Sequence, residues 1–141
     1  MTFEELDQRF PNGFDDAEIS RLSLDYRNQT AALHLNLRGN LPDSPNSDQY
    51  RGATLVLNGL HYFSIEPPDR DHLSWSGRSK ITVDGLPEDP QSFPLIEHVK
   101  PTLPVGAFFC RFYVHDWNSF IHVAADDAQF SWVEDEAQQN S

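Results

Sequence analysis

Histidine side chains are the groups in this sequence best suited to chemistry, since imidazole binds transition metals and transfers protons near neutral pH. The chain has six of them, but no two stand two or four residues apart within one element, the spacing that puts two rings on one ion. His115-Asp116 followed by His122 comes nearest, because both histidines would share one face of a hairpin. The sequence places no carboxylate as a third ligand there, so we interpret the pair as solvent-edge histidines beside aromatic rings and predict no metal site.

Carboxylates are the second group that could carry chemistry. Asp15, Asp16 and Glu18 cluster ahead of the first predicted strand, and paired carboxylates can share a proton or hold a divalent cation. Aspartates at such places more often accept hydrogen bonds from backbone amides. We therefore assign the cluster to the turn that follows Gly13.

Motifs for nucleophilic catalysis and cofactor binding are absent from the sequence. It contains no Gly-x-Ser-x-Gly elbow, no Gly-x-Gly-x-x-Gly loop and no Walker loop, the local patterns that place a nucleophile or a phosphate at a sharp turn. We therefore expect no cofactor and assign no catalytic residue. A small metal-dependent or hydrolytic enzyme stays open as an alternative, because distant strands can assemble a site without a local pattern. Its groups would be the histidine pair with Asp116, or Asp15 with Asp16.

Charge limits the partners that the protein can bind. Twenty-two acidic residues stand against ten basic ones, a formal net charge of -12. Nucleic acids and anionic lipids are bound mainly through Lys and Arg, so we expect binding to neither nucleic acid nor membrane. The same charge would attract a basic protein partner, although an acidic composition also serves solubility alone.

The cysteine count and the N-terminal residues indicate the compartment. Cys110 is the single cysteine, which excludes an intrachain disulfide and a cysteine zinc cluster. Its neighbours Phe108, Phe109 and Phe112 indicate a core strand, so a buried structural thiol is expected. Acids stand at the N-terminus where a secretory signal has a basic region, and no apolar run approaches the length of a membrane span. These features predict a cytoplasmic protein.

A short helix is predicted at the N-terminus. Thr2 is placed to cap it, and Glu5 completes a capping box three residues later. Leu6 and Phe10 supply one apolar stripe before Pro11-Asn12-Gly13 ends the helix. About two turns are too short to be stable alone in water, so this helix must dock on the sheet.

From Ile19 the apolar period changes to two, which predicts an amphipathic hairpin over 19–37. With a two-residue turn at Asn28-Gln29, Leu24 would face Leu33, and all the large apolar side chains would share one face. Further short strands are expected at 53–57, 60–65, 80–83 and 130–133. Residues 38–50 are typical of a loop, and 86–104 hold five of the ten prolines, which predicts an irregular segment pinned by Phe93, Leu95 and Ile96.

The hairpin near the C-terminus decides which aromatic side chains are exposed. A turn at Trp117-Asn118 would pair Phe112 with Val123 and give one wholly apolar face. The opposite face would display aromatic and basic groups of the kinds that anchor protein interfaces. The alternative is that another segment covers this face as a second core layer. The predicted binding residues on this face and its turn are Phe109, Arg111, Tyr113, His115, Trp117, Phe120 and His122.

These elements predict a mainly β fold, an antiparallel sandwich or curled sheet of about seven to eight short strands with one short N-terminal helix. The 141 residues suit one domain. We expect residues 1–133 to form a single β-rich domain and 134–141 to form a polar C-terminal tail.

One local pattern carries a resemblance to known proteins. Asn12–Ile19 (Asn-Gly-Phe-Asp-Asp-Ala-Glu-Ile), followed by Leu22–Tyr26 (Leu-Ser-Leu-Asp-Tyr), resembles the start of small β-rich bacterial proteins, some of them grouped with immunity proteins of polymorphic toxin systems. Those proteins open with Phe-His-Asp-Ala or Phe-His-Asp-Ser and then an amphipathic hairpin, whereas Asp15 stands here where the pattern has histidine. The resemblance covers about the first forty residues, implies a bacterial immunity-type protein, and names no catalytic residue.

Charge and resemblance together favour a non-enzymatic protein-binding domain, namely an immunity-type inhibitor whose acidic surface meets a basic toxin. The small enzyme described above is the first alternative. A homo-oligomeric structural module that associates through the aromatic face is the second.

Overall fold

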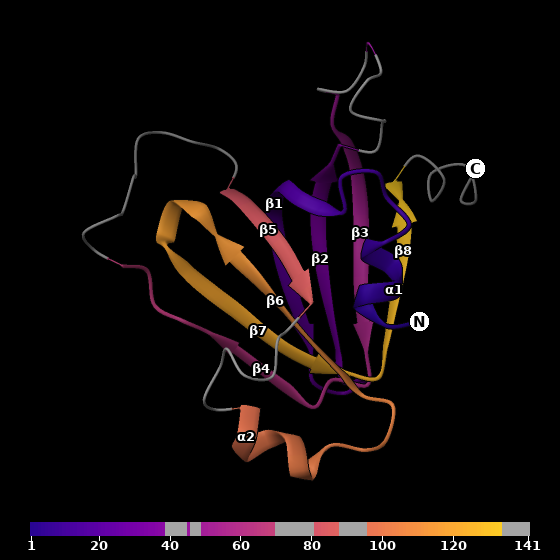
Figure 1. The fold of residues 1–141 in the computed structure, drawn as a ribbon, viewed down its shortest axis with the longest axis vertical. Helices are drawn as coiled ribbons and strands as arrows, with labels where there is room; N and C mark the ends of the chain where they lie inside the picture. Colours follow the sequence, from indigo (N-terminus) through magenta and orange to yellow (C-terminus); the bar gives the residue numbers. More distant parts are fainter. Residues whose placement is uncertain (39–44, 46–48, 70–80, 88–95, 134–141) are drawn as a thin grey trace.

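The structure is a computed structural model, and it describes residues 1–38, 45, 49–69, 81–87 and 96–133. Its eight strands form one antiparallel sheet in the order β4-β7-β6-β5-β1-β2-β3-β8. The mainly β fold with a short N-terminal helix is confirmed (Figure 1). In chain order the elements are α1 (Phe3–Asp7), β1 (Phe14–Asp25), β2 (Thr30–Leu37), β3 (Arg51–Asn58), β4 (Tyr62–Ile65), β5 (Ile81–Pro87), α2 (Ile96–Val99), η1 (Lys100–Thr102), β6 (Phe108–Val114), η2 (His115–Trp117), β7 (Ser119–Ala125) and β8 (Asp127–Trp132).

Hydrogen bonds link the β3–β4 connection to the end of β7 and the β7–β8 connection to the end of β3, next to the first residues of the two edge strands, β4 and β8. Asp126, between β7 and β8, donates its N–H to the carbonyl of Asn58 at 2.9 Å, and His61, between β3 and β4, donates its N–H to the carbonyl of Ala124 at 2.8 Å. In Figure 1, β4, β6 and β7 run obliquely to β2, β3 and β8. The sheet is therefore curled, as one of the two predicted arrangements requires.

The core fills the inside of the curl. Side chains of β2 and β3 alternate between buried and half-buried, the period of two expected of strands with one face on a core. Helix α1 docks against this core with Phe3 and Leu6 buried. The ring centroid of Phe3 lies 4.9 Å from that of Phe14 in β1 and 5.5 Å from that of Phe112 in β6. This docking stabilises a helix of five residues that could not persist alone.

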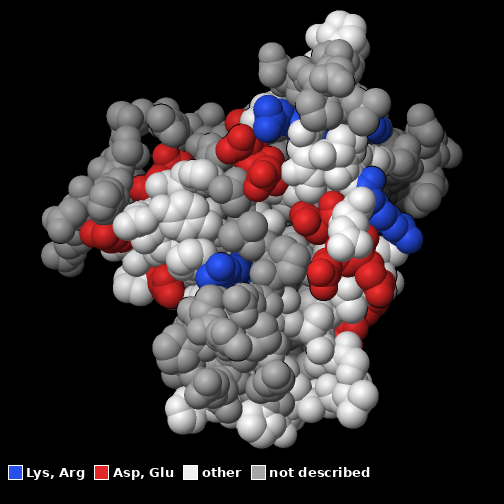
Figure 2. All heavy atoms as spheres, in the orientation of Figure 1, with Lys and Arg blue, Asp and Glu red and all other residues white. Residues whose placement is uncertain are grey.

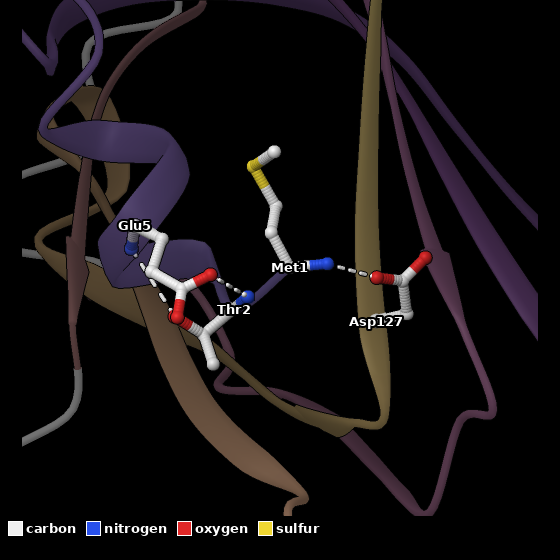
Figure 3. A network of polar contacts seen from close by, with 4 residues as sticks. All are labelled: Met1, Thr2, Glu5 and Asp127. Atoms are coloured by element: carbon white, nitrogen blue, oxygen red, sulfur yellow. Dashed lines mark hydrogen bonds and ion pairs between the residues drawn. The ribbon is translucent and has the colours of Figure 1, made fainter.

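The predicted capping box at α1 is confirmed. Thr2 Oγ1 accepts the N–H of Glu5 at 3.1 Å, and Glu5 Oε2 accepts the N–H of Thr2 at 3.3 Å (Figure 3). The helix ends at Asp7, earlier than predicted, and turns connect it to β1. The prediction for the single cysteine is confirmed as well, since Cys110 is fully buried in β6.

The β1–β2 hairpin has a different register from the predicted one. Leu24 faces Ala31, not Leu33, because the turn contains four residues, 26–29, in place of two. The carboxylate of Asp25 accepts the backbone N–H groups of Arg27 and Asn28 and the side-chain amide of Asn28, which stabilises the wider turn. The register moves by an even number of residues, so Leu24 keeps its predicted face.

The β6–β7 hairpin shows the same kind of difference. Phe112 faces Ile121, not Val123, and Cys110 faces Val123. The turn spans η2 and Asn118, which adopts a left-handed conformation with φ 46°. Asparagine tolerates that conformation better than most residues, so it closes a four-residue turn here. The apolar and the mixed faces are nevertheless those predicted.

The remaining strands differ mainly at their ends. β4 begins at Tyr62, β8 spans Asp127–Trp132, and β5 reaches Pro87, so the predicted irregular segment 86–104 begins later than expected. Pro87 is the last residue of its strand, where a missing N–H disturbs the ladder least. That segment also contains α2 and η1. Phe93, Leu95, most of the 38–50 loop and the 134–141 tail lie outside the described residues.

The described part of the chain contains no helix that is both long and apolar enough to span a membrane.

Candidate protein-binding face

The outer face of β6 and β7 carries most of the predicted binding residues. Directly opposite pairs on this face join Arg111 to His122 and Tyr113 to Phe120. Their neighbours along each strand, such as Phe112, are buried in the core. Since successive side chains of a strand point to opposite faces, the mixed aromatic and basic residues point away from the core, as the sequence predicted.

Four side chains on this face form a chain of contacts that we call the aromatic ladder: Arg111, Phe120, Tyr113 and His115. The guanidinium carbon of Arg111 lies 4.9 Å from the ring centroid of Phe120. The centroid of Phe120 lies 5.1 Å from that of Tyr113, which lies 5.2 Å from that of His115. Contacts of this kind are each favourable by about 0.5–1.5 kcal/mol beyond area burial, so they restrict the rotamers of the ladder.

Hydrogen bonds hold the turn end of the ladder in place. The hydroxyl of Tyr113 donates to Oδ1 of Asn118 at 2.5 Å, and Nδ2 of Asn118 donates to Oδ2 of Asp69 at 3.3 Å. Asp69 in turn donates its backbone N–H to the carbonyl of Trp117 at 2.8 Å. The segment after β4 is thereby fastened to the β6–β7 turn, and the ring of Tyr113 is fixed from both ends.

Glu66 holds the strand end of the ladder, and sequence analysis did not identify it as a site residue. Its carboxylate accepts the backbone N–H of Phe120 on Oε1 at 3.0 Å and lies 3.0 Å from Nε2 of His122 through Oε2. Its own N–H donates to the carbonyl of Phe120 at 3.0 Å. Glu66 and His122 are fifty-six residues apart, so no local sequence pattern indicates this contact.

The other predicted binding residues differ in accessibility. His115 is exposed, and Phe109 is half-buried. His122 is only 2% exposed, so its ring is buried beneath the other side chains of this face and is not accessible to a partner. Trp117 packs against the core and borders a hollow of about 180 Å³ with Ile19 and Ile65. It therefore lies outside the aromatic ladder.

The histidine pair and the acidic cluster do not come together as a metal centre. His115 and His122 lie on the same face, but the Tyr113–Phe120 pair stands between them. No group of three or more His, Cys, Asp or Glu side chains suited to a metal ion exists within residues that the structure describes.

At the turn after Gly13, Asp7 accepts a backbone amide, a role that we predicted for the acidic cluster. Phe14 N–H, after Gly13, donates to Oδ1 of Asp7 at 2.9 Å, so Asp7 is the acceptor at that turn. Asp16 instead forms an ion pair with Arg38, with 3.3 Å between Oδ2 and Nη2. Burial raises the pKa of Asp7 above 3.8, the Phe14 N–H opposes that shift, and the charges of Asp15 and Glu4 add to it.

Comparison with known proteins identifies no family. No protein-family model and no curated protein matches the sequence. The chain has a distant structural likeness to an uncharacterized protein from Neisseria gonorrhoeae, known from a crystal structure, with a TM-score of 0.39 and 10% sequence identity over 83% of this chain and 91% of that one.

Proposed function

We propose that this protein is a non-enzymatic binding domain that holds a basic protein partner on the outer face of β6 and β7. The observation that carries the proposal is the aromatic ladder, whose Tyr113 and Phe120 rings are half-buried and fixed by neighbours on several sides. Aromatic and arginine side chains contribute most of the affinity at protein interfaces. Fixing them before association lowers the entropy lost on binding.

Carboxylates around the ladder favour a basic partner. Glu66 and Asp69 bond to residues of the β6–β7 hairpin, and Asp116 lies in the turn itself. Lys and Arg side chains of a partner could contact these carboxylates and the faces of the aromatic rings together. Figure 2 shows more Asp and Glu than Lys and Arg on the viewed face, and the net charge of -12 would speed the encounter with such a partner.

The partner that we propose is a basic toxin, which makes the protein an immunity-type inhibitor. This finer step rests on the resemblance of the N-terminal hairpin region to proteins of that kind and on the sign of the charge. It needs no catalytic group and no cofactor, because occlusion of a toxin surface by tight binding is sufficient for inhibition.

The test is recovery of bound proteins from native cells with the tagged protein at low and at moderate salt. Tyr113→Ala removes a central ring of the ladder, and Tyr113→Phe keeps the ring but removes the hydroxyl that bonds to Asn118. Tyr26→Ala is the matched control, since Tyr26 lies in the β1–β2 turn and is 90% exposed. Circular dichroism spectra would establish that all variants are folded.

We expect wild type and Tyr26→Ala to recover the same basic protein, with recovery falling as salt rises. Tyr113→Ala should weaken binding by about 30-fold or more, the effect of losing an interface residue worth about 2 kcal/mol. Tyr113→Phe should have a smaller effect. Salt-insensitive binding, equal loss in both alanine variants, or no recovered protein would contradict the proposal.

A further inference from the structure

A small hollow opens between β1 and the β6–β7 hairpin. Its volume is about 180 Å³. Val114 and Ile121 line it and are only 2% and 5% exposed, so they form its floor. Ile19 and Leu22 of β1 line one side of it and pack against the core. The hollow is therefore an opening into the hydrophobic core.

The hollow lies where β1 extends beyond its described pairing with β5. That pairing ends at Ile19, opposite Ile81, whereas β1 continues to Asp25. A β-bulge between Ile19 and Arg21 interrupts the β1–β2 register at the same place and bends the strand. Across the hollow stand Trp117 and Ile65, the last residue of β4, which is 50% exposed. An apolar side chain thus borders the open side.

The charge of this hollow differs from that of three larger ones. The hollows of about 850, 370 and 480 Å³ have Asp127, Asp25 and Asp7, respectively, among their lining residues. The described lining of the small hollow includes Arg21 and no carboxylate. Arg21 is exposed and forms no ion pair with any residue that the structure describes. A cation is therefore available at the side of an apolar hollow.

Two carboxylates are close in sequence but do not line the hollow. Glu66 follows Ile65, and its oxygens contact the N–H of Phe120 and the ring of His122. Asp116 precedes Trp117 in η2. Neither is among the residues that border the hollow, so the charge nearest to its open side is that of Arg21.

We propose that this hollow binds a small organic acid that carries one aromatic ring, with the ring against Trp117 and the floor and the carboxylate at Arg21. An apolar cavity of about 150 Å³ can hold a benzene ring, so a hollow of about 180 Å³ accommodates one ring. The carboxylate then stays at the open side. A guanidinium binds a carboxylate through two parallel hydrogen bonds, which fixes the orientation of the ligand.

Local charge selects an acid over an amine of the same shape. An organic cation would bring its charge next to Arg21, and the hollows that contain aspartates suit it better. The net charge of -12 repels any anion at long range. At physiological salt, however, the Debye length is about 8 Å, so Arg21 determines selectivity once the ligand reaches the hollow.

The proposal is independent of the proposed function. The aromatic ladder lies on the outer face of β6 and β7, whereas Val114 and Ile121 of the same strands are buried on the core side. Binding of a small acid can be measured on the protein alone, without the basic partner. Either proposal can therefore fail without the other.

The test is a titration of the full chain with phenylacetate from about 0.1 mM to about 20 mM, followed by methyl NMR spectra. An aromatic ring in the hollow should shift the methyl signals of Ile19, Ile65 and Ile121 through its ring current. Leu55 of β3 is fully buried and does not line the hollow, so its methyl signals are the reference. Acetate has no ring, phenylacetamide has the same shape without the charge, and 2-phenylethylammonium has the opposite charge.

Two glutamine variants separate local charge from net charge. Arg21→Gln removes the proposed carboxylate partner. Arg27→Gln is the matched control, because it removes the same charge in the β1–β2 turn, and Arg27 does not line the hollow. Circular dichroism spectra would establish that both variants are folded.

We expect saturable shifts with phenylacetate at a Kd on the order of 1 mM, about fivefold weaker binding of phenylacetamide, and still weaker binding of the ammonium compound and of acetate. Arg21→Gln should weaken phenylacetate binding by about fivefold and leave phenylacetamide unchanged, whereas Arg27→Gln should change neither. The proposal is overturned if phenylacetate causes no saturable shift of the three isoleucine methyls. Equal affinity for acid and amide, tighter binding of the ammonium compound, or equal losses in the two variants would overturn it too.

Discussion

Oε2 of Glu66 lies 3.0 Å from Nε2 of His122, and this contact joins the end of β4 to the centre of the outer face of β7. The histidine is 2% exposed, whereas the Glu66 side chain is 40% exposed. The other carboxylate oxygen accepts the N–H of Phe120. A single half-exposed carboxylate thus closes over a buried imidazole and a strand amide, next to the rings of the aromatic ladder.

Replacement of Glu66 by alanine should destabilise the protein by about 1–3 kcal/mol, because it removes the acceptor used by a buried side chain and by a strand N–H. Glu66→Gln should cost less, since an amide oxygen can still accept the N–H of Phe120. Urea unfolding followed by tryptophan fluorescence measures both free energies. Equal losses for the two variants would show that the acceptor geometry contributes nothing, and wild-type stability for Glu66→Ala would contradict the role assigned to Glu66.

Gly85→Ala should also destabilise the protein, through packing. A Cβ at residue 85 would lie 2.7 Å from Cβ of Phe14 and 3.0 Å from ring atoms of Phe112 and Phe3, so the aromatic core must shift, at a cost of about 1–3 kcal/mol. Gly52→Ala is the matched control, because its nearest neighbour would be a methyl of Val133 at 3.4 Å.

The control change should be neutral or stabilise by up to about 1 kcal/mol, as alanine lowers the entropy of the unfolded chain. Thermal and urea unfolding of the two alanine variants provide the comparison. Similar stabilities would mean that the core around residue 85 is less closely packed than these distances indicate.

The alternation of apolar residues was enough to predict the strands and their faces, but not their register. Leu24 and Phe112 lie on their predicted faces opposite unexpected partners, because both hairpin turns have four residues in place of two. A register error of two residues leaves every side chain on its own face, so the alternation of apolar residues does not reveal such an error. Turn length depends here on the Asp25 carboxylate and on the left-handed Asn118.

The candidate site was predictable only in part, for a related reason. Tyr113 and Phe120 follow one hairpin, whose period of two assigns them to one face. Glu66 and Asp69 reach the same face from the segment after β4. The order of strands in the sheet decides that contact, and a strand pattern carries no information about which strands become neighbours.

Asp7 should make stability depend on pH in the acidic range. Burial raises the pKa of its carboxyl above 3.8, and Asp15 and Glu4 add to the shift. The folded state therefore holds this proton more tightly than the unfolded state, and the Asp7 contribution to stability falls as pH rises from about 3.8 through the raised pKa. Asp7→Asn can keep an acceptor for the Phe14 N–H and carries no charge.

At neutral pH this variant should be more stable than wild type by less than about 1 kcal/mol, because the carboxylate is partly exposed and its charge is screened. The difference should disappear below about pH 3.8. Urea unfolding of both proteins at several pH values measures the difference. A wild-type advantage that grows with pH would contradict the assigned sign.

Cys110 should be unreactive in the folded protein and should report on opening of the β6–β7 hairpin. Its thiol is fully buried, and Cys110 in β6 faces Val123 in β7. A thiol reagent therefore reaches it only when these two strands separate. Labelling with a maleimide, followed by mass spectrometry, should be slow in buffer and complete in urea, with the rate rising in Glu66→Ala. Gly52→Ala, which should not destabilise the protein, should label as slowly as wild type. Rapid labelling of the native protein would show that the hairpin opens far more readily than its burial implies.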